Sequence, residues 1–537
     1  MMNIKNLSDK TTFCLFLTVI TVGYVYLSHR YMPIIANDAL NGLVTSHNYE
    51  LTEIWNTHYY LSDSLQITST FLTWWAPGQY VIPLFFSALL GVSLGFAISI
   101  SCGLSLYFGA LLYYELFVFL QVEKRIINFS LSILILQRFV NLNFFQYSSS
   151  DIYLFCIIPL ITLFFIKYTN SMLGITKAIL LSIVLFLLCM IGLFIKNSFV
   201  IYLIGLNIFN AYNFTTSKKL MKENLSSVFF AVLSILAVFI YWFLFLSRGS
   251  SIPAEGNGIT FTWINFFNGL IPTLVESFFA CLSCGAILAN IHDGLVSYFD
   301  LNLGWSPLGL MFGAIILIFT FNLIKESTKN QHFYLFNSVL LVFLVSWFLF
   351  KILGSVVSTE DRLFFPVSVL FLPIFIERVM SNRKNKLNRL FIFFILLTVL
   401  FGIYSIPNRI RNYNISGSSI AGNLFFKDFK VFSYYDKTDL EFFQRLDLIS
   451  NSDEKLYLVV PNAEIGMLLK TNHILVTPPP MRRNDTAIQK LINCNVKESL
   501  PYRCVVISPV LQENEGLSQM KFNLIDRSAN FFAYRNF

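Results

Sequence analysis

The sequence is short of charge. Only 13% of its 537 residues are Asp, Glu, Lys or Arg, whereas soluble domains carry roughly 25%, and 55% are hydrophobic with a mean hydropathy of +0.64. This shortage excludes a soluble globular chain, and the long apolar runs indicate a polytopic membrane protein. The formal net charge of +8 does not indicate nucleic acid as a partner, because much of the basic excess lies in short loops between apolar runs, where it reports topology.

The eight cysteines lack the spacing of a zinc site. Cys281 and Cys284 lie in a hydrophobic stretch without nearby His partners, which favours packing over metal binding. Cys494 and Cys504 are ten residues apart and flank a predicted helix-to-strand connection. In an oxidising compartment they could form a disulfide, and two unpaired thiols fit the spacing equally well.

Eleven apolar segments read as membrane spans. The first, Thr11–His29, follows Lys5 and Lys10 and lacks a small-residue cleavage site, so we expect an uncleaved anchor with a cytoplasmic N-terminus. The stretch after Gly78 is too long for one crossing, so we expect an interfacial piece (GQYVIPLFFSALL) and then a span from Leu94. The remaining spans are Ile126–Phe145, Ile152–Ile166, Ala178–Ile195, Phe199–Tyr212, Leu225–Leu246, Leu308–Ile324, Phe333–Leu353, Leu363–Val379 and Leu390–Tyr404.

Basic loops alternate with mixed or acidic loops along these spans, and the side with the basic loops should face the cytoplasm. We therefore expect a multi-pass protein of a bacterial inner (plasma) membrane, all-α within the membrane. Its expected parts are a transmembrane domain at 1–407, a first outer, catalytic loop at 31–79, a second outer loop at 247–305, and a small α/β domain at 408–537 on the outer side.

The tail from 408 differs in composition from the rest of the chain. Short β-rich runs (KLYLVVPN, HILVTPPP, RCVVISPV and FFAYRNF) are typical of strands. Amphipathic runs (LEFFQRLDLIS, AEIGMLLK and AIQKLINC) are typical of helices.

Charged residues within or beside apolar runs gather on the predicted outer side. A charge in the bilayer costs a few kcal/mol and usually has a functional partner. Arg138 lies inside a span and is followed by the polar run NLNFFQYSSSD, so the end of that helix should be unwound. Asp151 begins the next span and Lys196 interrupts the outer end of another. Each of these charges, taken alone, is compatible with a structural ion pair. Taken together they are compatible with a pocket in which cationic side chains bind a phosphate and carboxylates act on an acceptor.

The order of these features resembles the GT-C superfamily of polyprenyl-phosphate-sugar-dependent glycosyltransferases, in the branch of protein mannosyltransferases and lipid A aminoarabinose transferases. Those proteins follow their first span with a large outer loop that carries an acidic pair, and here NDALNGL occupies that place. Further matches, over roughly the first 410 residues, are PGQYVIPLFF at the entry to the second span, SSSDIYLF with Asp151, GLFIKNSF with Lys196 and TEDRLFFPVSVLFLP with Arg362.

The resemblance implies an inverting transferase that moves a hexose or pentose from a polyprenyl-phosphate donor to a lipid, glycan or protein acceptor. Asp38 would be the catalytic base, and Asp151 would orient a base or a sugar hydroxyl. The donor phosphate would be bound by Lys196, Arg362 and Arg138. The first acid of the family's pair is Asn37 here, which disfavours a divalent metal, so no cofactor is expected.

Three aromatic residues close the first outer loop. Trp74, Trp75 and Tyr80 could stack on a sugar or line a lipid groove, although Trp and Tyr at membrane interfaces are ordinarily anchors. The Trp pair stands where the family has His-Pro-Pro, so the acceptor can differ from those of known members.

Alternative functions remain open at this stage. A lipid-linked sugar flippase should show an internal repeat, and we find none in the sequence. A polysaccharide polymerase or ligase would place its large loop late in the chain, whereas the large loop here is early. A catalytically degenerate family member is compatible with Asn37.

Overall fold

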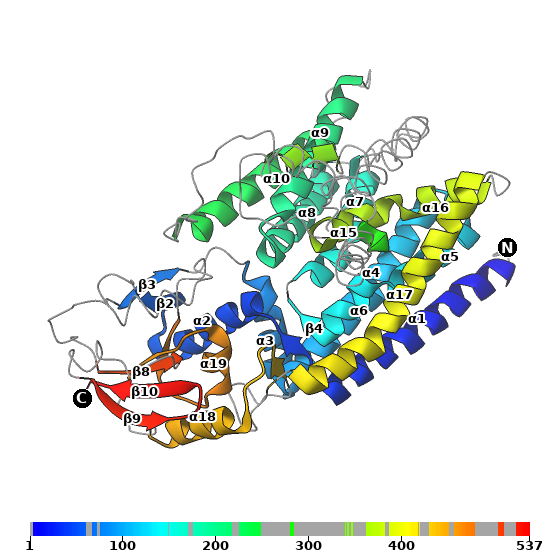
Figure 1. The fold of residues 1–537 in the computed structure, drawn as a ribbon. Helices are drawn as coiled ribbons and strands as arrows, with labels where there is room; N and C mark the ends of the chain where they lie inside the picture. Colours follow the sequence, from blue (N-terminus) through cyan, green and yellow to red (C-terminus); the bar gives the residue numbers. More distant parts are fainter. Residues whose placement is uncertain are drawn as a thin grey trace.

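The computed structural model combines a bundle of long helices with two β-sheets at one end of the bundle (Figure 1). The structure describes residues 4–60, 67–71, 76–148, 150–169, 175–216, 225–248, 280–283, 361–381, 386–416, 418, 429–449, 456–477, 503–509 and 522–536, together with isolated positions between 339 and 349.

Most of the predicted spans form helices. The long helices are α1 (Ile4–Tyr31), α4 (Leu94–Phe119), α7 (Asp151–Thr169), α8 (Ile175–Ile195), α9 (Phe199–Thr216), α10 (Leu225–Leu244) and α17 (Lys386–Ser416). Six helices in the described part of the chain are long and apolar enough to cross a membrane, and α9 falls just short of that length. The chain is thus a multi-pass membrane protein. The expected split after Gly78 is confirmed: α3 (Gly78–Leu90) ends at Gly91, whose φ of 62° suits glycine, before α4 begins.

The count of eleven spans stays a prediction. Leu308–Ile324 lies outside the described residues, and only isolated helical positions of Phe333–Leu353 are described. The predicted span Leu363–Val379 is broken into α15 (Asp361–Ser368), a 3₁₀ turn (η4, Val369–Phe371) and α16 (Leu372–Ser381).

The prediction of one continuous helix at Ile126–Phe145 is wrong. The segment consists of α5 (Lys124–Ile135) and α6 (Arg138–Phe145), bent by 41°, and the break lies in its middle rather than at its end. Neighbouring helices bind the polar groups at this break: Tyr24 Oη donates to Ile135 O at 3.1 Å, and Gln137 Nε2 donates to Thr398 Oγ1 at 3.0 Å. Such partners are what makes broken backbone tolerable within a membrane.

A seven-stranded sheet joins the first loop to the C-terminal part of the chain. Its order is β3-β2-β7-β6-β8-β10-β9. The strands are β2 (Asn56–Tyr60), β3 (Ile67–Phe71), β6 (Tyr457–Val459), β7 (Ile474–Thr477), β8 (Cys504–Pro509), β9 (Asn523–Arg527) and β10 (Phe531–Arg535). The four strands predicted in the tail are confirmed as β6, β7, β8 and β10. The hairpin β2–β3 was not expected, because it comes from the 31–79 loop and pairs in parallel with β7.

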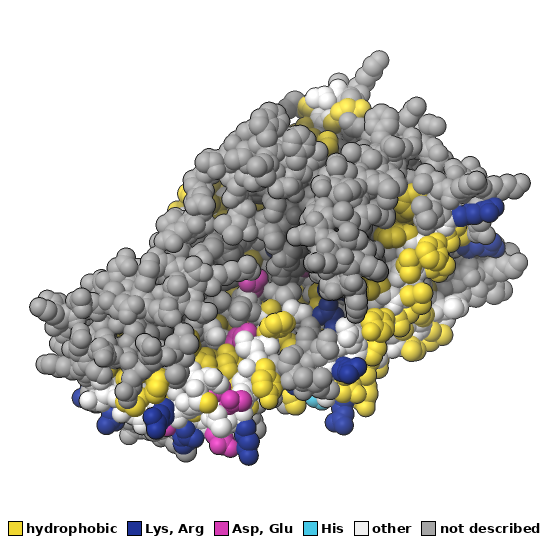
Figure 2. Space-filling model, viewed as in Figure 1, with side chains coloured by type: hydrophobic (Ala, Val, Ile, Leu, Met, Phe, Trp, Pro, Cys, Tyr) yellow, Lys and Arg dark blue, Asp and Glu magenta, His cyan; other side chains and the backbone are white. Residues whose placement is uncertain are grey.

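Three helices in the described part of the chain accompany the seven-stranded sheet, and we refer to the sheet and these helices together as the sheet layer. The helices are α2 (Asn37–Thr52), α18 (Lys437–Ile449) and α19 (Ala463–Leu468). The side chain of Asn462 caps α19 by accepting from Ile465 N at 2.8 Å. The predicted helix AIQKLINC lies outside the described residues. Lys, Arg, Asp and Glu side chains gather at the end of the molecule that holds the strands and α18, whereas hydrophobic side chains line the helices α1 and α17, with Lys and Arg again at the opposite end (Figure 2).

A smaller, three-stranded sheet lies where this layer meets the bundle. Its order is β4-β1-β5, and both pairings are parallel. Its strands are β1 (Ile34–Ile35), β4 (Gln146–Tyr147) and β5 (Lys430–Val431). All three come from segments that the sequence placed on the outer side, and we refer to the end of the bundle where they meet as the sheet end.

Two buried histidines lie at the seam between the first loop and the C-terminal strands. His47 Nε2 donates to His473 O at 3.0 Å, and Asn48 Nδ2 lies 3.4 Å from His58 Nδ1. The same Asn48 amide exchanges two hydrogen bonds of 2.8 Å with the backbone of Leu475 in β7. Burial lowers the pKa of both His47 and His58, so the seam favours neutral imidazoles.

We therefore expect the sheet layer to lose stability in acid. A histidine whose pKa is lower in the folded state adds stability above its unfolded pKa, about 6.5, and loses it as the pH falls through the folded pKa. The thermal midpoint, followed by intrinsic fluorescence, should fall between pH 7.5 and 5. The variant His47→Gln/His58→Gln should show a flatter pH profile, and a profile parallel to that of the wild type would contradict this assignment.

Candidate functional site

Two acidic residues are directed to the same edge of the small sheet. β1 and β4 run in parallel, with Ile35 opposite Tyr147, and Ala36 N donates to Tyr147 O at 2.9 Å. Asp38 follows Ile35 by three residues in the first turn of α2, and Asp151 follows Tyr147 by four residues as the first residue of α7. Both therefore lie beyond the carboxyl ends of neighbouring parallel strands, which is where ligand sites form in α/β sheets.

The two acids differ in their surroundings. Asp38 is half-buried, whereas the Asp151 side chain is only 1% exposed and forms an ion pair with Lys196. Lys196 Nζ donates to Asp151 Oδ1, and the Lys196 side chain is 17% exposed. Ser150 Oγ donates to Ile195 O at 2.5 Å and ties the end of α8 to the start of α7. The structure thus brings together Asp151 and Lys196, and their predicted roles in catalysis and phosphate binding stay predictions.

Tyr80 lies at the base of the first loop. Its ring is 1% exposed and packs against Gly42 of α2, where a Cβ atom would lie 2.0 Å from the ring. Trp55 stacks on it with ring centroids 5.8 Å apart, and Trp55 Nε1 donates to Tyr80 Oη at 3.4 Å. Tyr80 therefore holds α2 against α3. Its contact with a sugar or lipid stays a prediction, and Trp74 and Trp75 lie outside the described residues.

The other two residues predicted to bind the donor phosphate, Arg138 and Arg362, have no described contact with the Asp151–Lys196 pair. Arg138 begins α6 at the break in the helix pair, with its guanidinium 5.9 Å from the Phe401 ring. The eight residues of α6 extend over about 12 Å between Arg138 and β4, so Arg138 lies deeper in the bundle than Asp151. Arg362 is the second residue of α15, and its side chain is outside what the structure describes.

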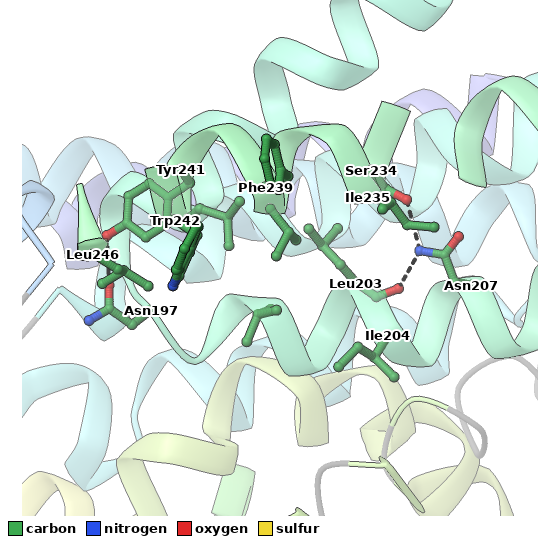
Figure 3. A pocket seen from close by; sticks show the side chains of 13 residues that line it. Asn197, Leu203, Ile204, Asn207, Ser234, Ile235, Phe239, Tyr241, Trp242 and Leu246 are labelled. Carbon is green, nitrogen blue, oxygen red and sulfur yellow. Dashed lines mark hydrogen bonds between the residues drawn. The ribbon is translucent and has the colours of Figure 1, made fainter. Parts of the chain in front are cut away.

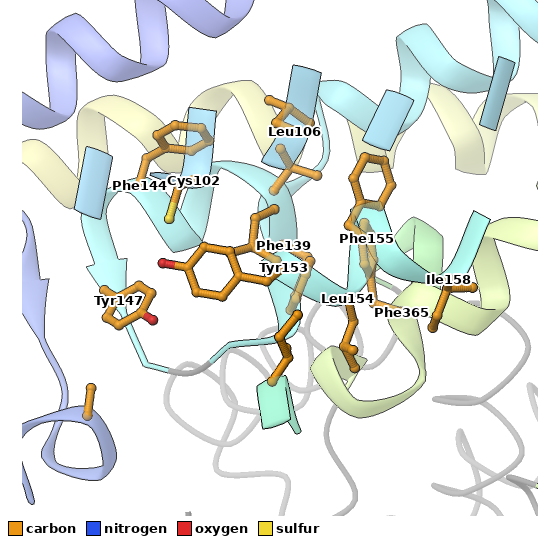
Figure 4. Packing of buried hydrophobic residues seen from close by; sticks show 14 of the residues in the cluster. Cys102, Leu106, Phe139, Phe144, Tyr147, Tyr153, Leu154, Phe155, Ile158 and Phe365 are labelled. Atoms are coloured by element: carbon orange, nitrogen blue, oxygen red, sulfur yellow. The ribbon is translucent and has the colours of Figure 1, made fainter. Parts of the chain in front are cut away.

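A buried aromatic cluster lies under the site and fixes α15 to α7 (Figure 4). Tyr147 and Tyr153 lie at one end of it, with ring centroids 6.3 Å apart. Toward the other end, Phe365 of α15 packs against Phe155 of α7 at 5.9 Å. Phe155 follows Asp151 by one helical turn and Phe365 follows Arg362 by nearly one, so the cluster sets the backbone position from which the Arg362 side chain starts.

An apolar groove of about 420 Å³ runs between α9 and α10 (Figure 3). One end is formed by Asn197, the neighbour of Lys196 in the sequence, where Tyr241 Oη donates to Asn197 Oδ1 at 2.6 Å. At the other end Asn207 Nδ2 donates to Ser234 Oγ at 2.8 Å. The wall on α9 is formed by Val200, Leu203, Ile204 and Asn207, at the spacing of one helix face. The sequence analysis missed this groove, because the same spacing occurs on every lipid-facing helix.

Neither a metal site nor a disulfide is formed among the described residues. No group of three or more His, Cys, Asp or Glu side chains lies together in the part of the chain that the structure describes. Cys504 is buried in β8 and Cys494 lies outside the described residues, so their pairing stays a prediction.

Comparison with solved structures finds chains of similar fold. ArnT from Cupriavidus metallidurans bound to undecaprenyl phosphate aligns with a TM-score of 0.49 and 9% identity over 98% of both chains. The Archaeoglobus fulgidus oligosaccharyltransferase tethered with an acceptor peptide aligns with a TM-score of 0.50 and 10% identity over 97% of this chain and 74% of that one. Its complex with Zn and sulfate gives 0.49 and 11%, over 96% and 73%.

These similarities concern the fold. They confirm the GT-C architecture that the sequence resemblance led us to expect, at identities too low to transfer a substrate. No protein-family model and no curated protein sequence matches the chain.

Proposed function

We propose that the protein is an integral-membrane glycosyltransferase that moves a sugar from a polyprenyl-phosphate donor to an acceptor at the sheet end of the bundle. The observation that carries the proposal is the Asp151–Lys196 ion pair, whose carboxylate follows the same edge of the small sheet as Asp38. The α9–α10 groove offers an apolar wall for a prenyl chain, and Lys196, the neighbour in sequence of its lining residue Asn197, offers a cation for the phosphate.

The residues divide the reaction as follows. Asp38 accepts the proton of the acceptor hydroxyl or amine, whose oxygen or nitrogen then attacks the anomeric carbon. The bond from that carbon to the phosphate oxygen breaks, and polyprenyl phosphate leaves with inversion at carbon. Lys196 and Arg362 stabilise the charge on the leaving phosphate. Asp151 is a positioning residue, because its carboxylate accepts a hydrogen bond from the Lys196 ammonium group and holds that group in place.

The acceptor is a lipid, a glycan or a protein segment that reaches the sheet end. We place the sheet layer and the C-terminal strands on the outer side of a bacterial inner membrane, since the basic loops lie at the opposite ends of the spans. The donor sugar is a hexose or a pentose, and the reaction as written needs no metal.

Binding of the reaction's lipid product tests the donor site without knowledge of the sugar. Undecaprenyl phosphate, added to the purified protein in nanodiscs, should raise the thermal midpoint, because a ligand that binds the folded state stabilises it. Undecaprenol, which lacks the phosphate, should raise it much less. Equal shifts with the two lipids would contradict a phosphate site at Lys196.

A further inference from the structure

We infer that helices α1 and α17, where they leave the membrane at the sheet end, form a binding surface for the headgroup of an anionic phospholipid, with Arg30 and Arg411 as its cations. The surface lies on other helices than those that carry Asp151 and Lys196. The inference goes beyond the proposed function, because no step of sugar transfer uses these two arginines.

Helix α1 has one exposed apolar face that ends in a cation. Its exposed large apolar side chains are Leu15, Val19, Val22 and Tyr26. They follow one another at intervals of three or four residues, which places them on one side of the helix. Little of this span is buried against the rest of the protein, so the face contacts lipid. Arg30 is exposed and follows Tyr26 by four residues, so it continues the same face at the membrane boundary.

Helix α17 repeats this arrangement. The exposed large apolar side chains in its middle are Leu396, Leu397, Leu400, Ile403 and Tyr404. Arg411 is exposed and follows Tyr404 by two helical turns, so it lies on the same face. Each face thus carries an exposed tyrosine, the residue type that anchors helices at membrane interfaces, before its arginine.

The two arginines lie at the same level of the bundle. Ser28 Oγ of α1 donates to Phe144 O, and Arg409 Nη1 of α17 donates to Gln146 Oε1 at 3.1 Å, so both helices are attached where α6 ends. Each arginine follows the contact residue of its own helix by two positions. Helices α1 and α17 run side by side along this flank of the bundle (Figure 1).

The charge of this surface fits a phosphate. The sequence places this end on the outer side of the membrane, where loops normally carry few Lys and Arg, so topology does not account for the arginines. Neither guanidinium forms an ion pair with a carboxylate in the part of the chain that the structure describes. His29 is exposed next to Arg30, and Lys430 of β5 is partly exposed opposite Ile34.

A phospholipid satisfies both parts of this surface. Figure 2 shows Lys and Arg side chains, with His beside them, where the hydrophobic surface of α1 and α17 meets the sheet layer. A guanidinium group binds phosphate oxygens through two parallel hydrogen bonds. The acyl chains of the same molecule then lie along the exposed apolar faces. A soluble anion would leave those faces without a partner.

The test titrates the full chain in a neutral detergent with phosphatidylglycerol or phosphatidylcholine of the same acyl chains, and native mass spectrometry counts the bound lipid. Each arginine near a charged headgroup should contribute about fivefold in affinity. Wild type should therefore bind phosphatidylglycerol about twenty-five-fold more tightly than phosphatidylcholine. Arg30→Gln and Arg411→Gln should each weaken phosphatidylglycerol binding about fivefold, and the double variant should abolish the preference. Binding of phosphatidylcholine should stay within about twofold.

Two further variants serve as controls. Lys437→Gln/Arg527→Gln removes two exposed cations from the sheet layer and should keep the preference. Asp151→Asn/Lys196→Met alters the proposed donor site and should keep it as well.

The outcomes separate this inference from the proposed function. Equal affinities of the wild type for the two lipids, or an unchanged preference in Arg30→Gln/Arg411→Gln, would overturn the inference. An equal loss in Lys437→Gln/Arg527→Gln would also overturn it, because net charge rather than these arginines would then select the lipid. Loss of the preference in Asp151→Asn/Lys196→Met would place the phospholipid at the donor site instead. The proposed function is tested by the undecaprenyl phosphate shift, whichever of these results is found.

Discussion

Replacing Asp38 by Asn should slow sugar transfer by about 10²–10⁴-fold, the usual contribution of a general base. The substitution keeps the size and shape of the side chain, so donor binding should persist with an unchanged dissociation constant for undecaprenyl phosphate. The loss should appear in kcat rather than KM. It is measured as release of polyprenyl phosphate in single turnovers with saturating donor.

Glu50 provides the matched control. It lies on the same helix, is exposed, and is separated from Asp38 by more than three turns. Glu50→Gln removes the same charge from α2 and should leave turnover within about twofold of the wild type. An equal loss in both variants would show that the charge of α2 matters but not the position of Asp38. Full activity in Asp38→Asn would move the base to another carboxylate, Asp151 or Glu360.

Breaking the Asp151–Lys196 pair should have the largest effect on stability. Lys196→Met leaves a carboxylate that is 1% exposed without its cation, and loss of one partner of a buried pair costs about 3–5 kcal/mol. The thermal midpoint of Lys196→Met should therefore fall steeply. The midpoint shift caused by undecaprenyl phosphate should disappear as well, since the ammonium group that binds the phosphate is gone.

The double variant Asp151→Asn/Lys196→Met separates these two effects. It removes the unpaired charge, so most of the stability should return, because a buried ion pair can often be replaced by neutral groups at little cost. Binding of undecaprenyl phosphate should not return. Recovery of both stability and binding would show that the pair is only structural.

The sequence predicted the parts of this protein that depend on local patterns. Apolar runs bounded by Lys and Arg predicted the helices α1, α4, α7, α8, α10 and α17, and short runs rich in β-branched and aromatic residues predicted β6, β7, β8 and β10. The sequence singled out Asp151 and Lys196 because each is a charge at the end of an apolar run, and such charges seek partners; that they pair with each other comes from the structure.

Contacts between segments that are far apart in the chain could not be predicted from the sequence. The run NTHYY at 56–60 has no apolar alternation, and it becomes strand β2 only because it pairs with β7, more than 400 residues away. The break in Ile126–Phe145 has no proline or glycine to announce it, and it persists because Tyr24 and the helix α17 supply hydrogen bonds. Gly402 allows α17 to approach, since a Cβ there would lie 2.1 Å from Leu136 O.

The central claim is that this chain transfers a sugar from a polyprenyl-phosphate donor, and donor turnover tests it most directly. Wild-type protein in nanodiscs is given a panel of radiolabelled polyprenyl-phosphate sugars with a membrane extract as acceptor, and released polyprenyl phosphate is measured beside Asp38→Asn. We predict release with at least one donor by the wild type and a loss of about 10²–10⁴-fold in the variant. No release from any donor, by a wild type that binds undecaprenyl phosphate, would contradict the claim and indicate a carrier or binding role instead.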